Sequence, residues 1–278
     1  MKNLKTCPVC GNQSFSFFFD ARNRYRLTDS YSYYKCDQCE LVLLDEREDN
    51  KDFVAYNLTE EPTGTQKLVL WLFHRRLQKL CKSGKVLDFG AGAGNLSQYL
   101  KAKGYDVDSF EVDEQSKQWL ANKRHLNVVE RFEKEHYDVI IMEQVLEHLP
   151  NPMETMGQLK AALKSDGVFL ISIPNINSFQ ARVFREKWFH LDAPRHVNHF
   201  HGKSFFRLME KLDLKVAKSY GFNFHMDLTG WYWSMRGKVT DLDLKTLIVL
   251  GFFLPLLILN TITKTTAYVL YVVAKKTV

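Results

Sequence analysis

The sequence predicts an α/β protein in which helices cover both faces of an open, mostly parallel sheet, preceded by a small cysteine-rich unit. Three observations carry this prediction. Short apolar runs alternate with helical stretches after residue 66, a glycine-rich turn follows the first of these runs, and two Cys-x-x-Cys pairs lie in the first fifty residues. With 45% hydrophobic and 25% charged residues among 278, the composition is that of a globular protein and excludes disorder as the main state.

The net charge and the N-terminal residues indicate which partners and which cellular compartment to expect. The formal charge of +6 suits an anionic surface or substrate but does not require nucleic acid. The first residues contain no apolar segment of the kind found in secretory signals, so we expect a cytoplasmic protein. Cysteines should then stay reduced, which favours metal binding over disulfides.

Cys7, Cys10, Cys36 and Cys39 form two Cys-x-x-Cys pairs separated by 25 residues. Two such pairs can place four thiolates around a tetrahedral zinc ion, and the aromatic residues between them alternate as in strands. This pattern resembles a zinc ribbon, although Glu40 stands where many ribbons have glycine. A closed four-cysteine site leaves no coordination position open, so we expect the zinc to be structural.

We therefore divide the chain into a zinc ribbon at residues 1–50, a polar linker at 51–65 and a larger domain at 66–278. In the larger domain the pattern predicts strands at Lys85–Phe89, Tyr105–Glu111, Tyr137–Met142, Gly167–Ile173, Leu214–Ser219 and Ala267–Ala274. Helices are expected at Leu68–Cys81, Asn95–Lys103, Glu114–Lys123 and Asn151–Lys164. Ligands of such sheets bind beyond the carboxyl ends of the strands, where the strand order reverses.

The turn after Lys85–Phe89 contains Gly90, Gly92 and Gly94, and small residues there let the backbone approach a ligand closely. This spacing differs from the G-x-G-x-x-G of dinucleotide enzymes, because Asn95 takes the place of the third glycine. A carboxylate at Asp88 would repel a pyrophosphate but would accept hydrogen bonds from an ammonium group. The turn therefore favours a cationic ligand that carries an amino acid.

At these residues the chain resembles the class I S-adenosylmethionine-dependent methyltransferases. The resemblance implies a Rossmann-like, doubly wound, seven-stranded sheet with an antiparallel last strand, and S-adenosylmethionine as cofactor. It implies cofactor-binding roles for Asp88, Phe89, Gly90, Gly92, Gly94, Glu111, Val112, Glu143 and Gln144. Asp113 is expected to cap the following helix instead. No aspartate ends the third strand, so the residue that contacts adenine is unassigned, with Glu130 as a stand-in.

The segment 188–201 holds four of the nine histidines and follows the fifth strand, so we expect it to overhang the cofactor. It resembles a Pro-Arg-His and His-Phe segment of ribbon-bearing methyltransferases that act on sugars, polyketide-like acids and other small or lipid-linked metabolites. We expect His196 or His199 to serve as the base, with His148 as the alternative. The other interpretation is that His196 and Arg195 only anchor this loop by hydrogen bonds.

A metal-assisted mechanism is a further alternative. Glu143 and Glu147 are four residues apart and would share a helix face beside His148 if that loop were helical. These three side chains would then offer ligands to a hard metal ion.

The residues from Thr246 to Thr263 are uncharged, and the strictly apolar part, Leu247–Leu259, has 13 residues. A membrane span needs about 20 residues. If the last strand returns to the sheet, this insertion at about 244–263 cannot cross a bilayer once. It would contact the inner membrane surface, pack internally or form a homodimer surface.

Together these features predict a cytoplasmic S-adenosylmethionine-dependent methyltransferase for a small or lipid-linked metabolite, such as a sugar or glycolipid precursor, with peripheral membrane contact as one alternative. A nucleic-acid methyltransferase that uses the ribbon as reader is the second candidate. The acidic residues that crowd the end of the ribbon disfavour it. A non-catalytic, cofactor-binding scaffold is the third.

Overall fold

The computed structural model describes residues 4–23, 29–45, 58, 61–222, 230–235 and 266–275. Its main sheet has seven strands in the order β10-β11-β8-β7-β4-β5-β6. The strands are β4 (Lys85–Phe89), β5 (Asp106–Phe110), β6 (Asn127–Val128), β7 (Tyr137–Glu143), β8 (Leu163–Pro174), β10 (Leu214–Phe222) and β11 (Tyr268–Lys275). Strands β4 to β8 pair in parallel, whereas β11 runs antiparallel to both β8 and β10. The predicted fold class is thus confirmed.

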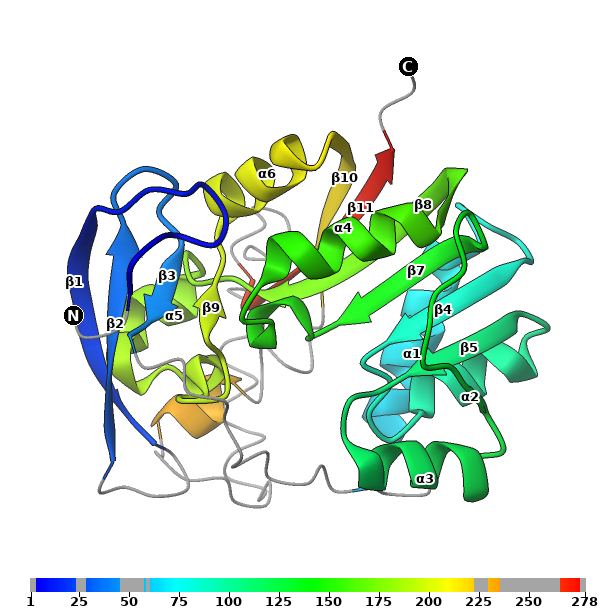
Figure 1. Ribbon diagram of the computed structural model, residues 1–278. Coiled ribbons are helices and arrows are strands. Elements are labelled where there is room, and N and C mark those ends of the chain that lie inside the picture. The colour runs from blue at the N-terminus through cyan, green and yellow to red at the C-terminus, as the bar shows by residue number, and fades with distance from the viewer. Residues whose placement is uncertain are drawn as a thin grey trace.

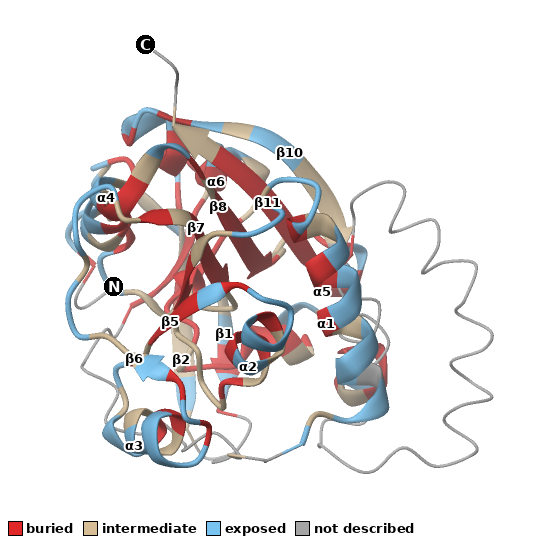
Figure 2. Cartoon of the chain, turned by 90° about the vertical axis from the view of Figure 1, so that its right-hand side faces the viewer, coloured by how far each residue is buried: buried red, intermediate tan, exposed pale blue. Residues whose placement is uncertain are grey.

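Helices lie on both faces of this sheet (Figure 1). The described α-helices are α1 (Gly64–Leu77), α2 (Asn95–Ala102), α3 (Glu114–Asn122), α4 (Pro152–Ala162), α5 (Phe179–Phe184) and α6 (Gly202–Lys211). Ala181 of α5 packs in a cluster that includes Tyr33 and Val42 of a second, N-terminal sheet. Apolar side chains of α1 and α2 pack with Val86 and Val139, while those of α4 and α6 pack with Leu87 and Ile140. Neighbouring strand residues therefore face opposite layers, which buries the central strands on both sides (Figure 2).

Local sequence signals start two of the helices. Thr63 and Gln66 form a reciprocal capping box at the start of α1. The carboxylate of Asp113 accepts a 2.7 Å hydrogen bond from the backbone N–H of Ser116 and caps α3, as predicted.

The largest differences from the predicted bounds are at α1 and where α4 meets β8. The first helix covers Gly64–Leu77 rather than the expected Leu68–Cys81. The helix expected to reach Lys164 ends at Ala162, and β8 begins at once with Leu163, four residues before the expected Gly167. The third strand, β6, has only two residues and is not among the strand ranges predicted from the sequence.

The N-terminal residues form a second sheet, of four strands in the order β1-β2-β3-β9. Strands β1 (Phe15–Arg22), β2 (Ser30–Cys36) and β3 (Val42–Leu44) belong to the cysteine-rich unit, defined here as the described part of residues 4–45. Strand β9 (Asn198–His199) comes from the segment after β8, and its residues pair with Val42 and Leu43. The histidine-containing segment, residues 188–201, therefore follows a strand of the main sheet and supplies a strand of the second sheet.

Side chains of the cysteine-rich unit also contact helices of the larger domain. Leu41 and Leu43 share one core with α4 and α6. Glu40 forms an ion pair with Lys203 at 2.7 Å, and its carboxylate lies 3.2 Å from Nε2 of His201. Its φ of 63° is the left-handed conformation that glycine supplies in many ribbons.

Two predicted segments fall wholly or largely outside the described residues. These are the linker at 51–65, of which only 58 and 61–65 are described, and the apolar insertion at about 244–263. Among the described helices, none is long and apolar enough to span a bilayer.

Candidate active site at the switch point of the sheet

A cavity of about 520 Å³ lies at the carboxyl ends of β4 and β7, where the strand order reverses. Its wall contains residues of α1, the glycine turn, the end of β7 and the segment after β8. The lining residues are Gln66, Val69, Leu70, Asp88, Gly90, Ala91, Gly92, Ala93, Asn95, Leu96, Glu143, Gln144, His148, Phe189, Asp192, Arg195, His196 and Trp233. This volume lies within the range of small-molecule sites.

The glycine turn needs its glycines for two different reasons. Gly90 and Gly94 have φ values of +82° and +77°, and a Cβ at either position would come within 2.5 to 2.6 Å of a packed side chain, Val145 or Leu120 respectively. Gly92 has φ of +53°, but a Cβ there would meet nothing within 4 Å. Gly92 therefore faces open space in the cavity wall, where a ligand can approach the backbone.

Two carboxyl groups lie close to this turn. Asp88 is 3% exposed and accepts a 2.6 Å hydrogen bond from the Ser97 hydroxyl. Burial raises the pKa of Asp88 to about 6, against the opposing effect of the Ser97 hydrogen bond. Burial and the charge of Asp88 raise the pKa of Glu143 to about 7. Two carboxyl groups that repel each other in this way provide a place for a cationic group.

Glu111 is hydrogen-bonded to the turn. Its carboxylate accepts 2.8 Å hydrogen bonds from the backbone N–H groups of Gly92 and Val112. Five of the predicted cofactor contacts line the cavity: Asp88, Gly90, Gly92, Glu143 and Gln144. Three others do not line it: Phe89, Glu111 and Val112. Gly94, also predicted to bind the cofactor, supports the turn from behind, and Glu130 is exposed and lies outside the lining.

Another part of the cavity wall contains His148 and His196, which are far from the glycine turn in the sequence. Their ring centroids are 4.6 Å apart. Nδ1 of His148 donates to the backbone carbonyl of Arg195 at 3.0 Å, and Nδ1 of His196 donates to that of His190 at 2.9 Å. A carbonyl oxygen can only accept, so Nδ1 carries the proton in both rings and the lone pair is on Nε2. Burial lowers the pKa of both imidazoles.

His199, the other predicted base, lies on β9 and does not line the cavity. Its side chain is buried among Tyr33, Trp188 and His196, and within the described part of the chain neither ring nitrogen has a hydrogen-bond partner. Burial lowers the pKa of His199 to about 3. His199 therefore contacts His196, which lines the cavity, but does not itself reach the cavity.

Glu147 stands out among the carboxylates. It is 1% exposed, neither of its oxygens has a hydrogen-bond partner among the described residues, and burial raises its pKa to about 8. Glu147, His148 and His196 each place one possible metal-ligand atom within 4.8 Å of the other two. The predicted set with Glu143 does not form, because Glu143 still belongs to the extended β7 and Leu146–His148 is a single 3₁₀ turn rather than a helix.

Several lining residues carried no signal in the sequence. Gln66, Val69 and Leu70 belong to a helix that reads as an ordinary core helix, and only tertiary packing brings it to the cavity. Asp192 binds the Arg195 guanidinium and also lines the cavity. Only its position, two residues before Pro194-Arg195-His196, could have indicated from the sequence that Asp192 belongs to the site.

The four cysteines of the N-terminal unit form a compact cluster. The Sγ atoms of Cys7 and Cys39 are 3.6 Å apart and those of Cys10 and Cys36 are 3.4 Å apart, and all four lie within 4.8 Å of one another. A tetrahedral zinc site with bonds of about 2.3 Å places its sulfurs about 3.8 Å apart. The donor set and its spacing therefore fit zinc.

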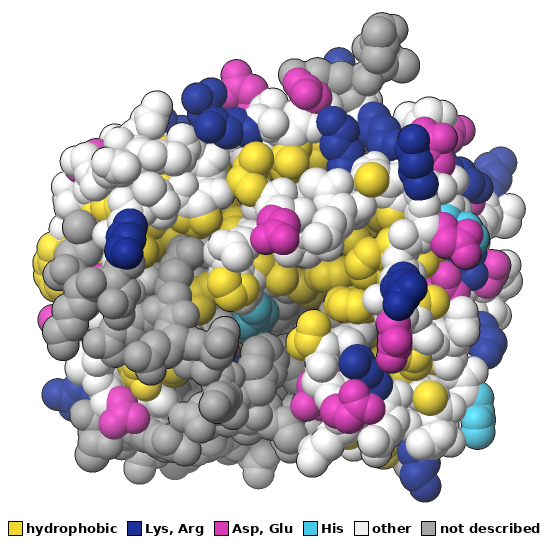
Figure 3. Space-filling view, viewed as in Figure 1, with side chains coloured by type: hydrophobic (Ala, Val, Ile, Leu, Met, Phe, Trp, Pro, Cys, Tyr) yellow, Lys and Arg dark blue, Asp and Glu magenta, His cyan; other side chains and the backbone are white. Residues whose placement is uncertain are grey.

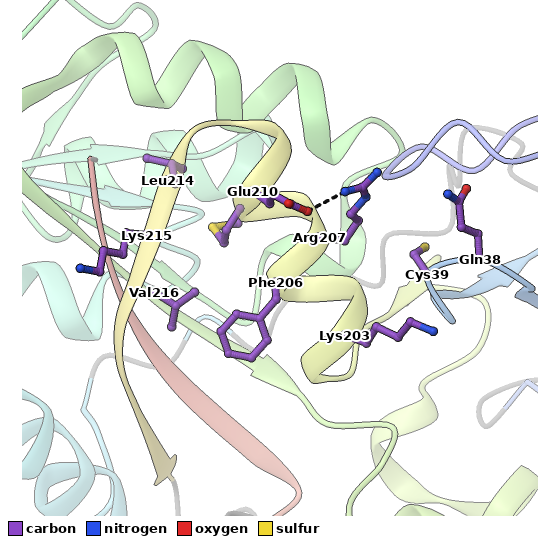
Figure 4. Close-up of a pocket in the computed structure, with 10 residues that line it drawn as sticks. Gln38, Cys39, Lys203, Phe206, Arg207, Glu210, Leu214, Lys215 and Val216 are labelled. Atoms are coloured by element: carbon purple, nitrogen blue, oxygen red, sulfur yellow. Dashed lines mark hydrogen bonds and ion pairs between the residues drawn. The ribbon is translucent and has the colours of Figure 1, made fainter. Parts of the chain in front are cut away.

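A second cavity, of about 700 Å³, lies between this cluster and α6 (Figure 4). Lys203, Arg207 and Lys215 lie around its apolar floor, and Arg207 is paired with Glu210 at 2.6 Å. Lys and Arg side chains are also frequent along the upper edge of the face in Figure 3, above the hydrophobic side chains. This cavity shares no lining residue with the first one and contains none of the glycine-turn residues.

Residues 64–219 match a family described as a methyltransferase domain, which is more than half of the chain. The chain belongs to this methyltransferase family. Solved structures with the same fold include an S-adenosylmethionine-dependent methyltransferase from Archaeoglobus fulgidus, with a TM-score of 0.53, 21% identity, and coverage of 76% of this chain and 94% of that one. Another is the [4+2]-cyclase SpnF, with a TM-score of 0.50, 10% identity, and coverage of 76% and 82%. The chain therefore carries a methyltransferase domain, and its fold is that of solved S-adenosylmethionine-dependent methyltransferases.

Curated relatives share shorter regions. A ubiquinone biosynthesis O-methyltransferase of Glaesserella parasuis is 35% identical over 107 residues, which are 33% of this chain and 45% of that protein. A protein of the same name from Haemophilus ducreyi is 27% identical over 175 residues, covering 54% of this chain and 72% of that protein. The chain thus spans about half the length of the first of these relatives.

Proposed function

We propose that this methyltransferase transfers the methyl group of S-adenosylmethionine to a hydroxyl group of a small molecule. One observation carries the proposal: a single cavity has the glycine turn and Asp88 in one part of its wall and His148 and His196 in another. A cofactor held at the turn would therefore face ionisable side chains across the space left for an acceptor.

The turn supports the cofactor half of the proposal. Asp88 and Glu143 place two carboxyl groups where the cofactor's ammonium group would bind, and Gly92 leaves its backbone accessible. Glu111 is proposed to bind the ribose hydroxyls, and its present hydrogen bond from Gly92 already holds it against the turn. Bound S-adenosylmethionine supplies an electrophilic methyl group on a sulfonium.

The residues across the cavity support the acceptor half. Methyl transfer mainly requires alignment of the acceptor and exclusion of water, and a hydroxyl also has to lose its proton. His196, or alternatively His148, is proposed as the base because each ring keeps its proton on Nδ1 and has its lone pair on Nε2. The Glaesserella relative is an O-methyltransferase by name, which favours an oxygen acceptor. We further propose a lipid-linked metabolite or a sugar as the acceptor, because residues 188–201 resemble a segment of methyltransferases that act on such molecules.

We assign the cysteine cluster a structural zinc ion, held by Cys7, Cys10, Cys36 and Cys39, since the four buried thiols fill a tetrahedral set. Such an ion would fix the sheet whose last strand, β9, belongs to the histidine segment. Contact with the inner membrane surface and homodimer formation through the insertion at about 244–263 stay predictions. Co-sedimentation with lipid vesicles tests the first, and the molar mass in solution tests the second.

The test uses the purified full-length protein with methyl-labelled S-adenosylmethionine and a whole-cell extract. We expect label in a small-molecule fraction, and partition into the organic phase would identify a lipid-linked acceptor. Asp88→Asn should abolish the transfer, while Asp166→Asn, an exposed carboxylate on the same domain, should not change it. Label that nuclease treatment releases would instead show a nucleic-acid substrate. Cofactor binding without any transfer would indicate a non-catalytic scaffold, and either result would overturn the proposal.

A further inference from the structure

We propose that Glu147, His148 and His196 form a binding site for one divalent transition-metal ion, of the class of Mn²⁺, Fe²⁺ or Zn²⁺, in the wall of the cavity. One possible ligand atom of each side chain lies within 4.8 Å of the other two. His148 and His196 also line the cavity. Two imidazoles and one carboxylate on one side of an ion leave its remaining coordination positions open, here toward the space for the acceptor.

The Glu147 carboxylate is the first independent observation. It is 1% exposed, and neither oxygen accepts a hydrogen bond from any residue that the structure describes. Burial keeps a carboxyl group without partners uncharged, and the ionised form is stable there only when a cation compensates its charge. A metal ion held between Glu147 and the two imidazoles would bind these oxygens and balance their charge.

The hydrogen bonds of the two histidines are the second. Metal-binding histidines usually donate the other ring N–H to a carbonyl or carboxylate, which fixes the tautomer and the ring orientation. His148 donates from Nδ1 to the carbonyl of Arg195, and His196 donates from Nδ1 to that of His190. Both rings are thus held so that Nε2 is the nitrogen with the lone pair. Asp192 adds negative charge nearby, with Oδ2 3.8 Å from Nε2 of His196.

The use of such an ion rests on the proposed function. The acceptor hydroxyl would occupy an open coordination position, where the ion favours loss of the hydroxyl proton to solvent. The oxygen then forms a bond to the methyl carbon, and the carbon–sulfur bond breaks with its electron pair going to sulfur. The products are a methyl ether and a neutral thioether. An ion would use the Nε2 lone pairs that a general base needs, so His196 cannot serve both roles at once.

The test is a titration of the full-length protein with Mn²⁺, in which the unbound ion is measured by electron paramagnetic resonance. Mn²⁺ is the suitable probe because imidazole and carboxylate sites accept it, whereas thiolate sites select softer ions such as Zn²⁺. We expect one Mn²⁺ per chain. Glu147→Gln and His196→Ala should each raise its Kd by about tenfold or more. Glu143→Gln, which removes a different carboxylate from the same cavity, should leave the Kd nearly unchanged.

Glu147→Gln is the deciding variant, because it keeps the size of the side chain and its folding can be checked by circular dichroism. The absence of saturable Mn²⁺ binding would overturn the proposal, and so would binding that Glu147→Gln does not weaken. The titration needs neither cofactor nor acceptor. Failure of the metal site is therefore distinguishable from failure of methyl transfer, which the labelling experiment measures.

Discussion

The hydroxyl of Tyr33 donates a 3.1 Å hydrogen bond to the backbone carbonyl of His196, although the two residues are 163 positions apart in the sequence. Both side chains are buried. Tyr33 lies on β2 of the cysteine-rich unit, and His196 lies in the wall of the cavity. Together with the pairing of β3 and β9, this bond makes the cysteine-rich unit a support for the segment that carries the candidate catalytic histidine.

Tyr33→Phe tests this support. The variant leaves the buried His196 carbonyl without its donor, so we expect the free energy of unfolding to fall by about 1–2 kcal/mol. We also expect a lower kcat with little change in cofactor affinity, because the glycine turn is untouched. Chemical denaturation and steady-state kinetics measure the two effects. Tyr31→Phe, on the same strand, is the matched control, and equal behaviour of the two variants would refute the supporting role.

Removal of one thiol tests the proposed zinc. Cys36→Ser should abolish the zinc that is released when the thiols are modified, and should destabilise the protein by about 3 kcal/mol or more. For a chain of this size that corresponds to a decrease in Tm of about 10 °C. Cys81→Ser changes a half-buried thiol outside the cluster and should alter neither quantity. A Cys36→Ser protein with unchanged Tm would rule out a structural ion here.

Much of the fold could be predicted because its signals are local. Each parallel strand is a short apolar run, and the turn from Gly90 to Gly94 follows directly from glycine spacing. The capping role of Asp113 could be predicted for the same reason. The expected bounds of β4 match the structure, while β8 begins four residues earlier than expected.

The candidate site was less predictable because its side chains are brought together by long-range packing. The metal-ligand group pairs Glu147 and His148 with His196 across 48 residues, and no local spacing indicates this. His196 and His199 are equivalent in the sequence. Only the pairing of His199 with Val42 on β3 directs one ring away from the cavity while the other lines it.

The two kinds of glycine in the turn should respond differently to the same substitution. In Gly90→Ala the new Cβ would come within 2.5 Å of Val145, at a φ of +82°, so we expect a loss of stability of about 2–4 kcal/mol. Gly92→Ala meets no neighbour and should lose only about 1 kcal/mol through backbone strain. Its main effect should be weaker cofactor binding, since the methyl group projects from the cavity wall. Thermal unfolding and calorimetric titration of both variants check this contrast, which fails if Gly92→Ala binds the cofactor normally.

Asp88 should make both stability and cofactor binding depend on pH. Burial raises its pKa in the folded protein from 3.8 to about 6, so between these values the folded state binds the proton more tightly than the unfolded state. The stability of the cofactor-free protein therefore falls as the pH rises through this range, by up to about 3 kcal/mol, and the loss persists above pH 6.

Asp88→Asn removes this titration, so the difference between its stability profile and that of the wild type isolates the contribution of Asp88 from those of other buried carboxyl groups. We expect the variant to gain stability relative to the wild type between pH 5 and 7.5, as measured by chemical denaturation at both values. Over the same range the wild type should bind S-adenosylmethionine more tightly as the pH rises, because the ammonium group pairs with the ionised carboxylate. The variant should bind it weakly at both pH values. Asp166→Asn, at an exposed position, should follow the wild type in both measurements, and a variant at position 88 with normal cofactor affinity would show that this carboxylate does not hold the ammonium group.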